Sequence, residues 1–301
     1  MTLFSRLARW FEAPAVVEMT ATPIEWPKAP APALFPVTPD LTARAVAERT
    51  APLRRPKFQP GNKLVVAIPY CAGDLGQVCN LLRWMSEIGG AKGYTVLLCA
   101  PAGLEDAEAD HVHALAEDVF SSVQTIRTSF DLPKEGWPIG TCWSFLHIAR
   151  HCNAAQWDFL IVEPDCVPLR SGWMREIEEE YRDCGLPYMG KIEPAAQGYP
   201  AHVAGNAVYH WGVFDQFPVG HLDQAWDIGL ASHMVPLAHH TDLIAQEWGK
   251  PGQPPVFTSV QDLERIPKQA VLFHRSKDGK VIELLRKRMQ WEEGRESPDL
   301  L

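Results

Sequence analysis

Two acidic residues separated by a single proline follow a short apolar segment of the sequence. Glu163, Pro164 and Asp165 come directly after residues 158–162, DFLIV. The proline fixes one backbone dihedral and stiffens the turn between the two carboxylates. Mg²⁺ and Mn²⁺ take oxygen ligands, commonly one or two carboxylates together with substrate phosphates. The pair is therefore a candidate cation site, and the alternative is an ordinary loop in which Asp165 caps a turn.

A second polar cluster follows another apolar segment much later in the chain. His274 ends residues 270–274, AVLFH, and Arg275 and Lys277 come directly after it. A neutral imidazole can complete a metal site built on carboxylates. Cationic side chains beside it can neutralise a departing diphosphate. The alternative is a half-buried histidine at a strand end, followed by a turn.

Apolar segments of strand length alternate with helical patterns between these clusters. Short connections between alternating strands and helices are typical of a doubly wound, mostly parallel sheet with helices on both faces. Ligands of such sheets bind beyond the carboxyl ends of the strands, where Glu163 and Asp165 stand. The predicted strands are 64–69, 95–100, 123–127, 158–162 and 270–274, and the predicted helices are 75–88 capped by Asp74, 104–116, 139–151 and one capped by Ser171.

The composition divides the chain into three predicted parts. Residues 1–60 form an arm with a short helix at 40–49, because ten of the 26 prolines lie in residues 13–60. Residues 1–12 have an amphipathic pattern, which predicts a helix that docks on the protein itself or contacts a membrane surface or a partner. Residues 61–292 form the catalytic α/β domain, and residues 293–301 form a tail.

The overall charge and the cysteines limit the classes of function. The chain of 301 residues has a formal net charge of -9, which disfavours binding nucleic acid through bulk electrostatics. Its seven scattered cysteines form no CxxC pair and favour reduced thiols in a cytoplasmic protein. No apolar segment reaches the roughly 20 residues that span a bilayer.

The segment from Gly140 to Leu169 resembles the core of GT-A-fold glycosyltransferases, in which an apolar strand ends in a DxD-type metal motif. The resemblance extends over residues 63–290 and implies a nucleotide-sugar donor and a Mn²⁺ or Mg²⁺ cofactor. It places Glu163, Asp165 and His274 on the metal, with Glu163 where the family usually has aspartate. It implies that the donor contacts Pro69, Tyr70, Asp74, Glu163, Gly205, Asn206, Arg275 and Lys277.

On the acceptor side, the resemblance implies a carboxylate base if the enzyme inverts the sugar configuration. Asp227 is the candidate and Asp223 its competitor. We expect a helix N-terminus at Asp227 to lower its pKa and keep it ionised. Residues 239–255 are interpreted either as a lid or as a plain surface loop.

The function expected from these features is a cytoplasmic, metal-dependent glycosyltransferase acting on an acceptor hydroxyl. The acceptor classes left open are a hydroxymethylated DNA base, as in phage DNA modification, and a glycan or small molecule. A sugar-nucleotide nucleotidyltransferase is an alternative, although residues 69–74 lack the basic residue that its phosphate loop needs. A non-catalytic scaffold that binds nucleotide sugars is the other alternative.

Overall fold

A computed structural model describes residues 58–128, 139–196, 198–216, 225–247 and 256–292. These residues belong to one compact unit, Leu53–Leu301. The predicted N-terminal helix, nearly all of the predicted arm, Asp223 and the predicted tail lie outside the described residues. Among the described residues, no helix combines the length and apolar character needed to cross a membrane.

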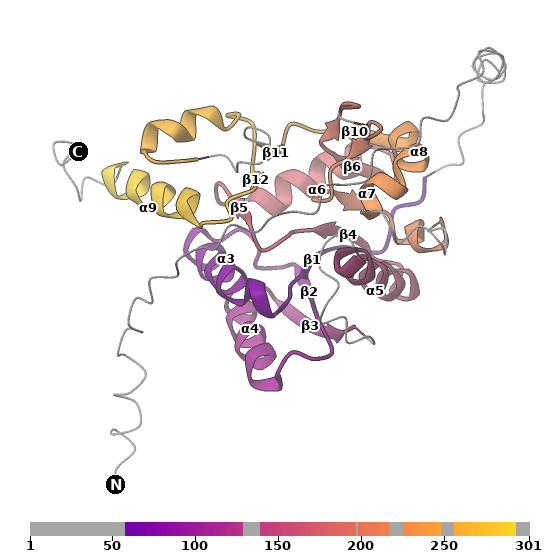
Figure 1. Cartoon of the computed structure of the whole chain (residues 1–301), viewed down its shortest axis with the longest axis horizontal. Helices are drawn as coiled ribbons and strands as arrows, with labels where there is room; N and C mark the ends of the chain where they lie inside the picture. The colour runs from indigo at the N-terminus through magenta and orange to yellow at the C-terminus, as the bar shows by residue number, and fades with distance from the viewer. Residues whose placement is uncertain (1–57, 129–138, 197, 217–224, 248–255, 293–301) are drawn as a thin grey trace, which may run out of the picture. The chain divides into compact units, whose positions relative to one another are not determined.

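The described chain is organised around a seven-stranded, mostly parallel sheet (Figure 1). The strand order is β10-β6-β9-β4-β1-β2-β3, and only β9 runs antiparallel to its neighbours within this sheet. The predicted α/β fold class is therefore confirmed. The strands are β1 (Leu64–Pro69), β2 (Thr95–Ala100), β3 (Ser122–Arg127), β4 (Asp158–Ile161), β6 (Tyr188–Gly190), β9 (Val208–Tyr209) and β10 (Ala238–His240).

Four long helices cover both faces of this sheet because β1, β2 and β4 are apolar on both sides. Alternate residues of a strand point to opposite faces. Val66 therefore packs in one core cluster with α3 (Leu75–Ile88), α4 (Asp106–Val119) and α6 (Trp173–Cys184). Val65 packs in a second cluster with α5 (Ile139–Ala155). Figure 1 shows α3 and α4 on one side of β1–β3 and α5 on the other.

A smaller sheet of three strands brings the end of the chain back to β4. Its order is β11 (Ile244–Gln246), β12 (Leu272–His274) and β5 (Cys166–Pro168). The strand predicted at 270–274 is β12, shortened to its last three residues. Because β12 pairs antiparallel with β5, His274 lies opposite Cys166, one residue after Asp165. This pairing joins two clusters that are far apart in the sequence.

The remaining elements are short, apart from one helix near the end of the chain. A two-stranded sheet pairs β7 with β8. The elements are η2 (Ala72–Asp74), β7 (Ile192–Glu193), β8 (His202–Val203), η3 (Trp211–Gln216), α7 (Trp226–Gly229), α8 (Ala231–Met234), η4 (Val235–Leu237), η5 (Val260–Arg265) and α9 (Lys280–Glu292).

One of the two predicted helix caps is the N-cap residue in the structure, and the other is not. Asp74 precedes α3, but its carboxylate accepts hydrogen bonds from the Cys71 backbone N–H at 3.2 Å and the Cys71 thiol at 3.0 Å. Asp74 is therefore the N-cap residue of α3, as predicted, but its side chain makes no capping hydrogen bond to this helix. Gly172 rather than Ser171 is the N-cap of α6, with a left-handed φ of 78°. A side chain at Gly90 would meet the Gly172 nitrogen at 2.4 Å, so this turn packs directly against the end of α3.

Candidate metal centre and donor site

Three side chains from two elements meet beyond the carboxyl end of β4. Ligand atoms of Glu163, Asp165 and His274 all lie within 4.8 Å of one another. The His274 Nε2 atom is 3.0 Å from the Glu163 Oε2 atom and 3.2 Å from the Asp165 Oδ1 atom. The structure thus brings together the three residues that the sequence proposes as metal ligands.

Local backbone geometry explains this meeting point. The Cys166 N–H donates to the Glu163 carbonyl at 2.9 Å, which closes a tight turn around Pro164. The Ser276 N–H donates to the Asp165 carbonyl at 2.9 Å, which ties the segment after β12 to the same turn. The acidic loop and the histidine strand are therefore held by backbone hydrogen bonds as well as by their side chains.

Charge and burial shift the pKa values of these three residues in opposite directions. Burial alone would lower the pKa of His274, but hydrogen bonds to Asp165 and Glu163 raise it to about 9. Burial alone would raise the pKa of Glu163 and of Asp165, but the hydrogen bond and charge of His274 lower both. Without a cation, an imidazolium therefore lies between two carboxylates.

Two amide side chains surround the three residues. The Asn206 amide donates to the Glu163 Oε2 atom at 2.8 Å, and its oxygen accepts from the Glu163 backbone N–H at 2.9 Å. The Gln246 Oε1 atom lies 2.8 Å from the His274 Nδ1 atom. Asn206 is 1% exposed, so its side chain orients Glu163, and the sugar contact predicted for it stays a prediction. Gln246 was not among the residues that the sequence proposes.

The donor set fits a hard divalent cation. Ligands at about 2.1 Å from an octahedral metal are about 3 Å apart when they are neighbours in its coordination shell. The two separations at His274, 3.0 and 3.2 Å, match that spacing. The exposed fractions of the side chains are 26% for Glu163 and 9% for Asp165, so solvent reaches the cluster from the side of Glu163.

Two predicted cationic residues flank the cluster. Burial lowers the pKa of Arg275, and the charges of Asp165 and Glu163 oppose that shift. The charge of Lys277 contributes to the lowered pKa of Asp165. Arg275 has a φ of 90°, a conformation that residues other than glycine rarely adopt and that is found preferentially at functional sites. Both side chains are thus close to where the resemblance places a diphosphate.

The three donor contacts predicted at the end of β1 lie in surroundings that differ from one another. The Tyr70 side chain is 4% exposed and packs in the core with α3 and α4, and burial raises its pKa to about 12. The Asp74 carboxylate is engaged with Cys71. Pro69 ends β1 beside Cys99 of β2. Donor contacts by Pro69, Tyr70 and Asp74 stay predictions.

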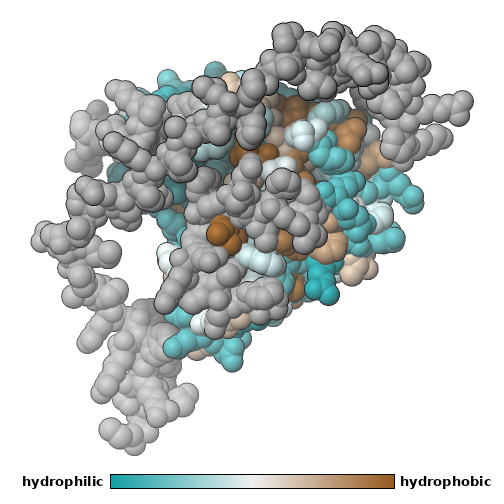
Figure 2. Space-filling model, turned by 45° about the vertical axis from the view of Figure 1, so that its right-hand side comes forward, coloured by the Kyte–Doolittle hydropathy of each residue, from teal (hydrophilic) through white to brown (hydrophobic). Residues whose placement is uncertain are grey.

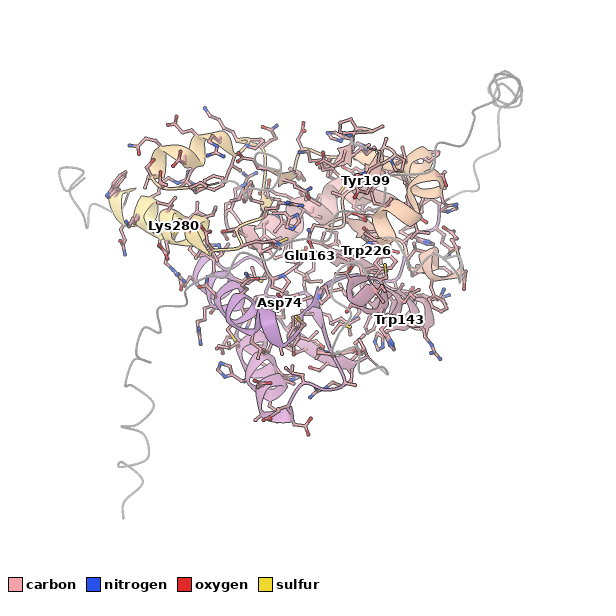
Figure 3. The ribbon with its side chains drawn as sticks, in the orientation of Figure 1. Asp74, Trp143, Glu163, Tyr199, Trp226 and Lys280 are labelled. Carbon is pink, nitrogen blue, oxygen red and sulfur yellow. The ribbon has the colours of Figure 1, made fainter. Side chains whose placement is uncertain are left out.

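The acceptor-side carboxylate Asp227 lies close to Gly205, one of the predicted donor contacts. A side chain on Gly205 would meet the Trp226 ring at 3.0 Å and the Asp227 Oδ2 atom at 3.8 Å. Asp227 is in α7, preceded by Ala225 as N-cap, and its Oδ1 atom accepts from the Ile228 N–H at 2.9 Å. In the view of Figure 3, Glu163 lies between Asp74, next to α3, and Trp226 of α7.

The predicted lowering of the Asp227 pKa is wrong. Burial raises its pKa to about 6, although the charge of His202 opposes the shift. The helix has only four residues, too few to offset burial with its dipole. Asp227 is therefore a carboxylate that holds a proton more readily than an exposed aspartate does.

The predicted lid divides into described strands and an undescribed remainder. Residues 239–240 belong to β10 and 244–246 to β11, with 241–243 connecting the two strands, and 248–255 lie outside the described residues. A cavity of about 380 Å³ adjoins β11, with Lys191, Gln246, Arg265 and Phe273 among its lining residues. Another cavity, of about 470 Å³, lies between α3 and α4.

On the face of the molecule seen in Figure 2, the described hydrophilic residues gather along the right-hand side, and the hydrophobic residues show in small groups.

Comparison with known proteins gives matches among solved structures alone. No family model matches the sequence, and no curated protein matches it. Mouse xyloside xylosyltransferase 1 is 11% identical, with a TM-score of 0.44, over 72% of this chain and 98% of that one. Galactosyltransferase LgtC, in complex with donor and acceptor sugar analogues, is 10% identical, with a TM-score of 0.44, over 74% and 95%. The bifunctional glycosyltransferase WbbM is 9% identical, with a TM-score of 0.47, over 73% and 46%.

Proposed function

We propose that this protein is a metal-dependent glycosyltransferase that moves a sugar from a nucleotide-diphosphate sugar to an acceptor hydroxyl. The observation that carries the proposal is the meeting of Glu163, Asp165 and His274 beyond the carboxyl end of β4, beside Arg275 and Lys277. An acidic metal site with adjacent cations matches the charge of a diphosphate leaving group. A parallel sheet binds its ligand at this end of its strands.

The cation that fits this site is Mn²⁺ or Mg²⁺, held by Glu163, Asp165 and His274. When bound, it would hold the donor diphosphate and offset the negative charge that develops as the diphosphate leaves. Arg275 and Lys277 contribute positive charge on the same side, through hydrogen bonds that strengthen as the bond to the sugar breaks. Asn206 keeps Glu163 oriented toward the cluster.

The transfer forms one bond and breaks another. The acceptor oxygen bonds to the anomeric carbon, and the bond from that carbon to the diphosphate oxygen breaks, with its electron pair leaving on the diphosphate. In the inverting case, Asp227 takes the proton of the acceptor hydroxyl. A raised pKa suits this role, because a base closer to neutrality accepts a proton more strongly than an ordinary aspartate does. Glycine is needed at position 205 beside Asp227, because a side chain there would meet the Trp226 ring at 3.0 Å.

The acceptor is proposed only as a hydroxyl compound. A glycan or small molecule agrees with the net charge of -9, whereas a hydroxymethylated DNA base would need a local basic groove. Both classes belong in the acceptor screen once a donor is known.

A donor screen tests the proposed function. Purified full-length protein is incubated with a panel of nucleotide sugars, with Mn²⁺, with Mg²⁺ or with chelator, and release of nucleoside diphosphate is measured. Slow, metal-dependent hydrolysis of one donor supports the transferase. Pyrophosphate exchange would instead indicate a nucleotidyltransferase, and no turnover or binding of any donor would favour the non-catalytic scaffold.

Asp227→Asn tests the proposed base once a donor and an acceptor are known. The amide keeps an oxygen that can accept from the Ile228 N–H but cannot take up the acceptor proton. We expect turnover to fall by roughly 10²-fold or more, with donor affinity unchanged. Near-normal turnover would exclude Asp227 as the base, and attention would move to Asp223 or to a retaining mechanism.

A further inference from the structure

The side chain of Gln246 is bound to the proposed metal ligand His274 and has no place in the reaction described above. Gln246 ends β11 and lies opposite His274 in the parallel pairing of β11 with β12. Its Oε1 atom is 2.8 Å from the His274 Nδ1 atom. The Lys191 ammonium donates to the Gln246 backbone carbonyl at 2.9 Å, which holds this end of β11 in position.

The two nitrogens of the His274 ring face different partners. Nε2 lies among the carboxylates, at 3.0 Å from Glu163 and 3.2 Å from Asp165, whereas Nδ1 faces only Gln246 among the hydrogen bonds seen in the described residues. A neutral imidazole carries one proton, and the nitrogen without it is the one that can bind a metal. A ring that binds through Nε2 must therefore keep its proton on Nδ1.

An acceptor at Nδ1 makes that arrangement favourable. An amide oxygen accepts the Nδ1 proton, whereas an apolar side chain at position 246 would leave a donor unpaired at a nearly buried ring. The same bond fixes the plane of the ring, so that Nε2 stays directed toward Glu163 and Asp165. In metal sites, partners of this kind commonly hold both the tautomer and the orientation of a ligating histidine.

We propose that Gln246 is a positioning residue of the metal site, which holds His274 in the Nδ1–H tautomer and so presents Nε2 to the cation. The inference rests on the proposed function in one respect, namely that His274 binds a metal. Gln246 does not touch the cation or the substrate, and it acts through the histidine alone.

The first test measures the affinity of Mn²⁺, added alone, from the loss of the free-ion electron paramagnetic resonance signal. In Gln246→Leu, which has no acceptor, we expect the affinity to fall by about 10- to 100-fold. Gln246→Glu keeps an acceptor at this position, and we expect it to bind at least as tightly as wild type. Gln124→Leu is the matched control, because it removes a similar Gln–His contact of 3.1 Å, to His151, on β3 and α5. This control should bind as wild type does.

The second test reports the tautomer directly. Imidazole ¹⁵N spectra are recorded with saturating Mg²⁺, which is diamagnetic and takes the place of the proton that the two carboxylates would otherwise hold on Nε2. Wild type should show the Nδ1–H form at His274, and Gln246→Leu should show a smaller population of that form at the same Mg²⁺ concentration. A merely structural role of Gln246 in β11 would lower the melting temperature and leave the tautomer unchanged.

The outcomes separate this inference from the proposed function. Wild-type protein that binds no Mn²⁺ would overturn the metal site and this inference with it. Wild type that binds Mn²⁺, together with Gln246→Leu that binds equally well and keeps the Nδ1–H form, would overturn the inference alone. A weaker affinity combined with a changed tautomer supports it.

Discussion

Carboxylate side chains lie at both ends of β4, but the groups that hydrogen-bond to them differ between the two ends. At the amino end, Asp158 is fully buried and accepts hydrogen bonds from the backbone N–H groups of Gly61, at 2.7 Å, and Trp211, at 3.2 Å. The Arg182 guanidinium lies 3.4 Å away. At the carboxyl end, Glu163 and Asp165 share a single histidine as their cationic hydrogen-bond partner.

The comparison shows how a structural carboxylate differs from one available to a ligand. The partners of Asp158 are mostly backbone groups of segments that it holds together, including the chain just before β1. The partner of Glu163 and Asp165 is a titratable side chain that can release its proton to solvent and leave a set of three ligands. Burial of a carboxylate alone therefore does not indicate function; the identity of its partners does.

The largest effect should come from Asp165→Ala, which removes one of the shared carboxylates. We expect Mn²⁺ affinity to fall at least 10²-fold and donor turnover about 10³-fold, because a charged ligand is lost from a site of three. The free energy of unfolding should change by no more than about 1 kcal/mol, since Glu163 remains as the partner of His274. Calorimetric titration and thermal unfolding measure the two quantities. Wild-type Mn²⁺ binding by the variant would remove Asp165 from the site.

Asp158→Ala should lower the stability of the protein and leave its metal affinity unchanged, the reverse of what we expect for Asp165→Ala. It leaves two backbone N–H groups and Arg182 without their buried acceptor, so we expect the free energy of unfolding to fall by about 3 kcal/mol. Mn²⁺ affinity of the folded protein should stay at the wild-type value. Asp158→Asn, which keeps an acceptor, is the matched control and should lose less. A stable Asp158→Ala protein with weakened metal binding would contradict the conclusion that Asp158 is structural and that only the carboxyl end of β4 binds a ligand.

Sequence patterns predicted the central strands well because those patterns are local. The apolar segments that became β1, β2 and β4 are buried on both faces, and their composition reflects that. The start of α4 was placed two residues early, because Glu105 is extended and begins the helix as its N-cap. The two- and three-residue strands β5 to β11 have too few residues to show a period and depend on partners distant in the chain.

The candidate site was predictable in part. Glu163, Asp165 and His274 each follow an apolar segment, and a parallel sheet directs attention to the ends of such segments. Gln246 was missed because its role depends on the pairing of β11 with β12, which no local pattern encodes. The pKa shift of Asp227 was predicted in the wrong direction, because the local sequence indicates a helix start and does not show that the carboxyl group is buried.

The smallest predicted effect concerns the stability of the protein with Asp227→Asn, and its sign depends on pH. The folded-state pKa of about 6 lies above the ordinary value of 3.8, so the folded protein binds more protons than the unfolded chain between those pH values. Stability contributed by the protonated group is therefore present below about pH 4 and is lost as pH rises through 6. At pH 7 the ionised side chain should cost about 2 kcal/mol, after allowance for its partial exposure to solvent.

Asparagine has no charge to bury, so Asp227→Asn should be more stable than wild type by about that amount at pH 7 and equal to it near pH 4. Denaturant unfolding at several pH values, without metal or donor, measures the difference. A gain in stability at neutral pH would mean that Asp227 is kept at a cost to the fold, as expected of a residue retained for its chemistry. In contrast to Asp158, whose replacement by alanine should weaken the protein, Asp227 would then belong with the carboxylates at the other end of β4. A variant that is less stable at pH 7 would instead assign Asp227 a structural role in α7 and leave the proposed base without support.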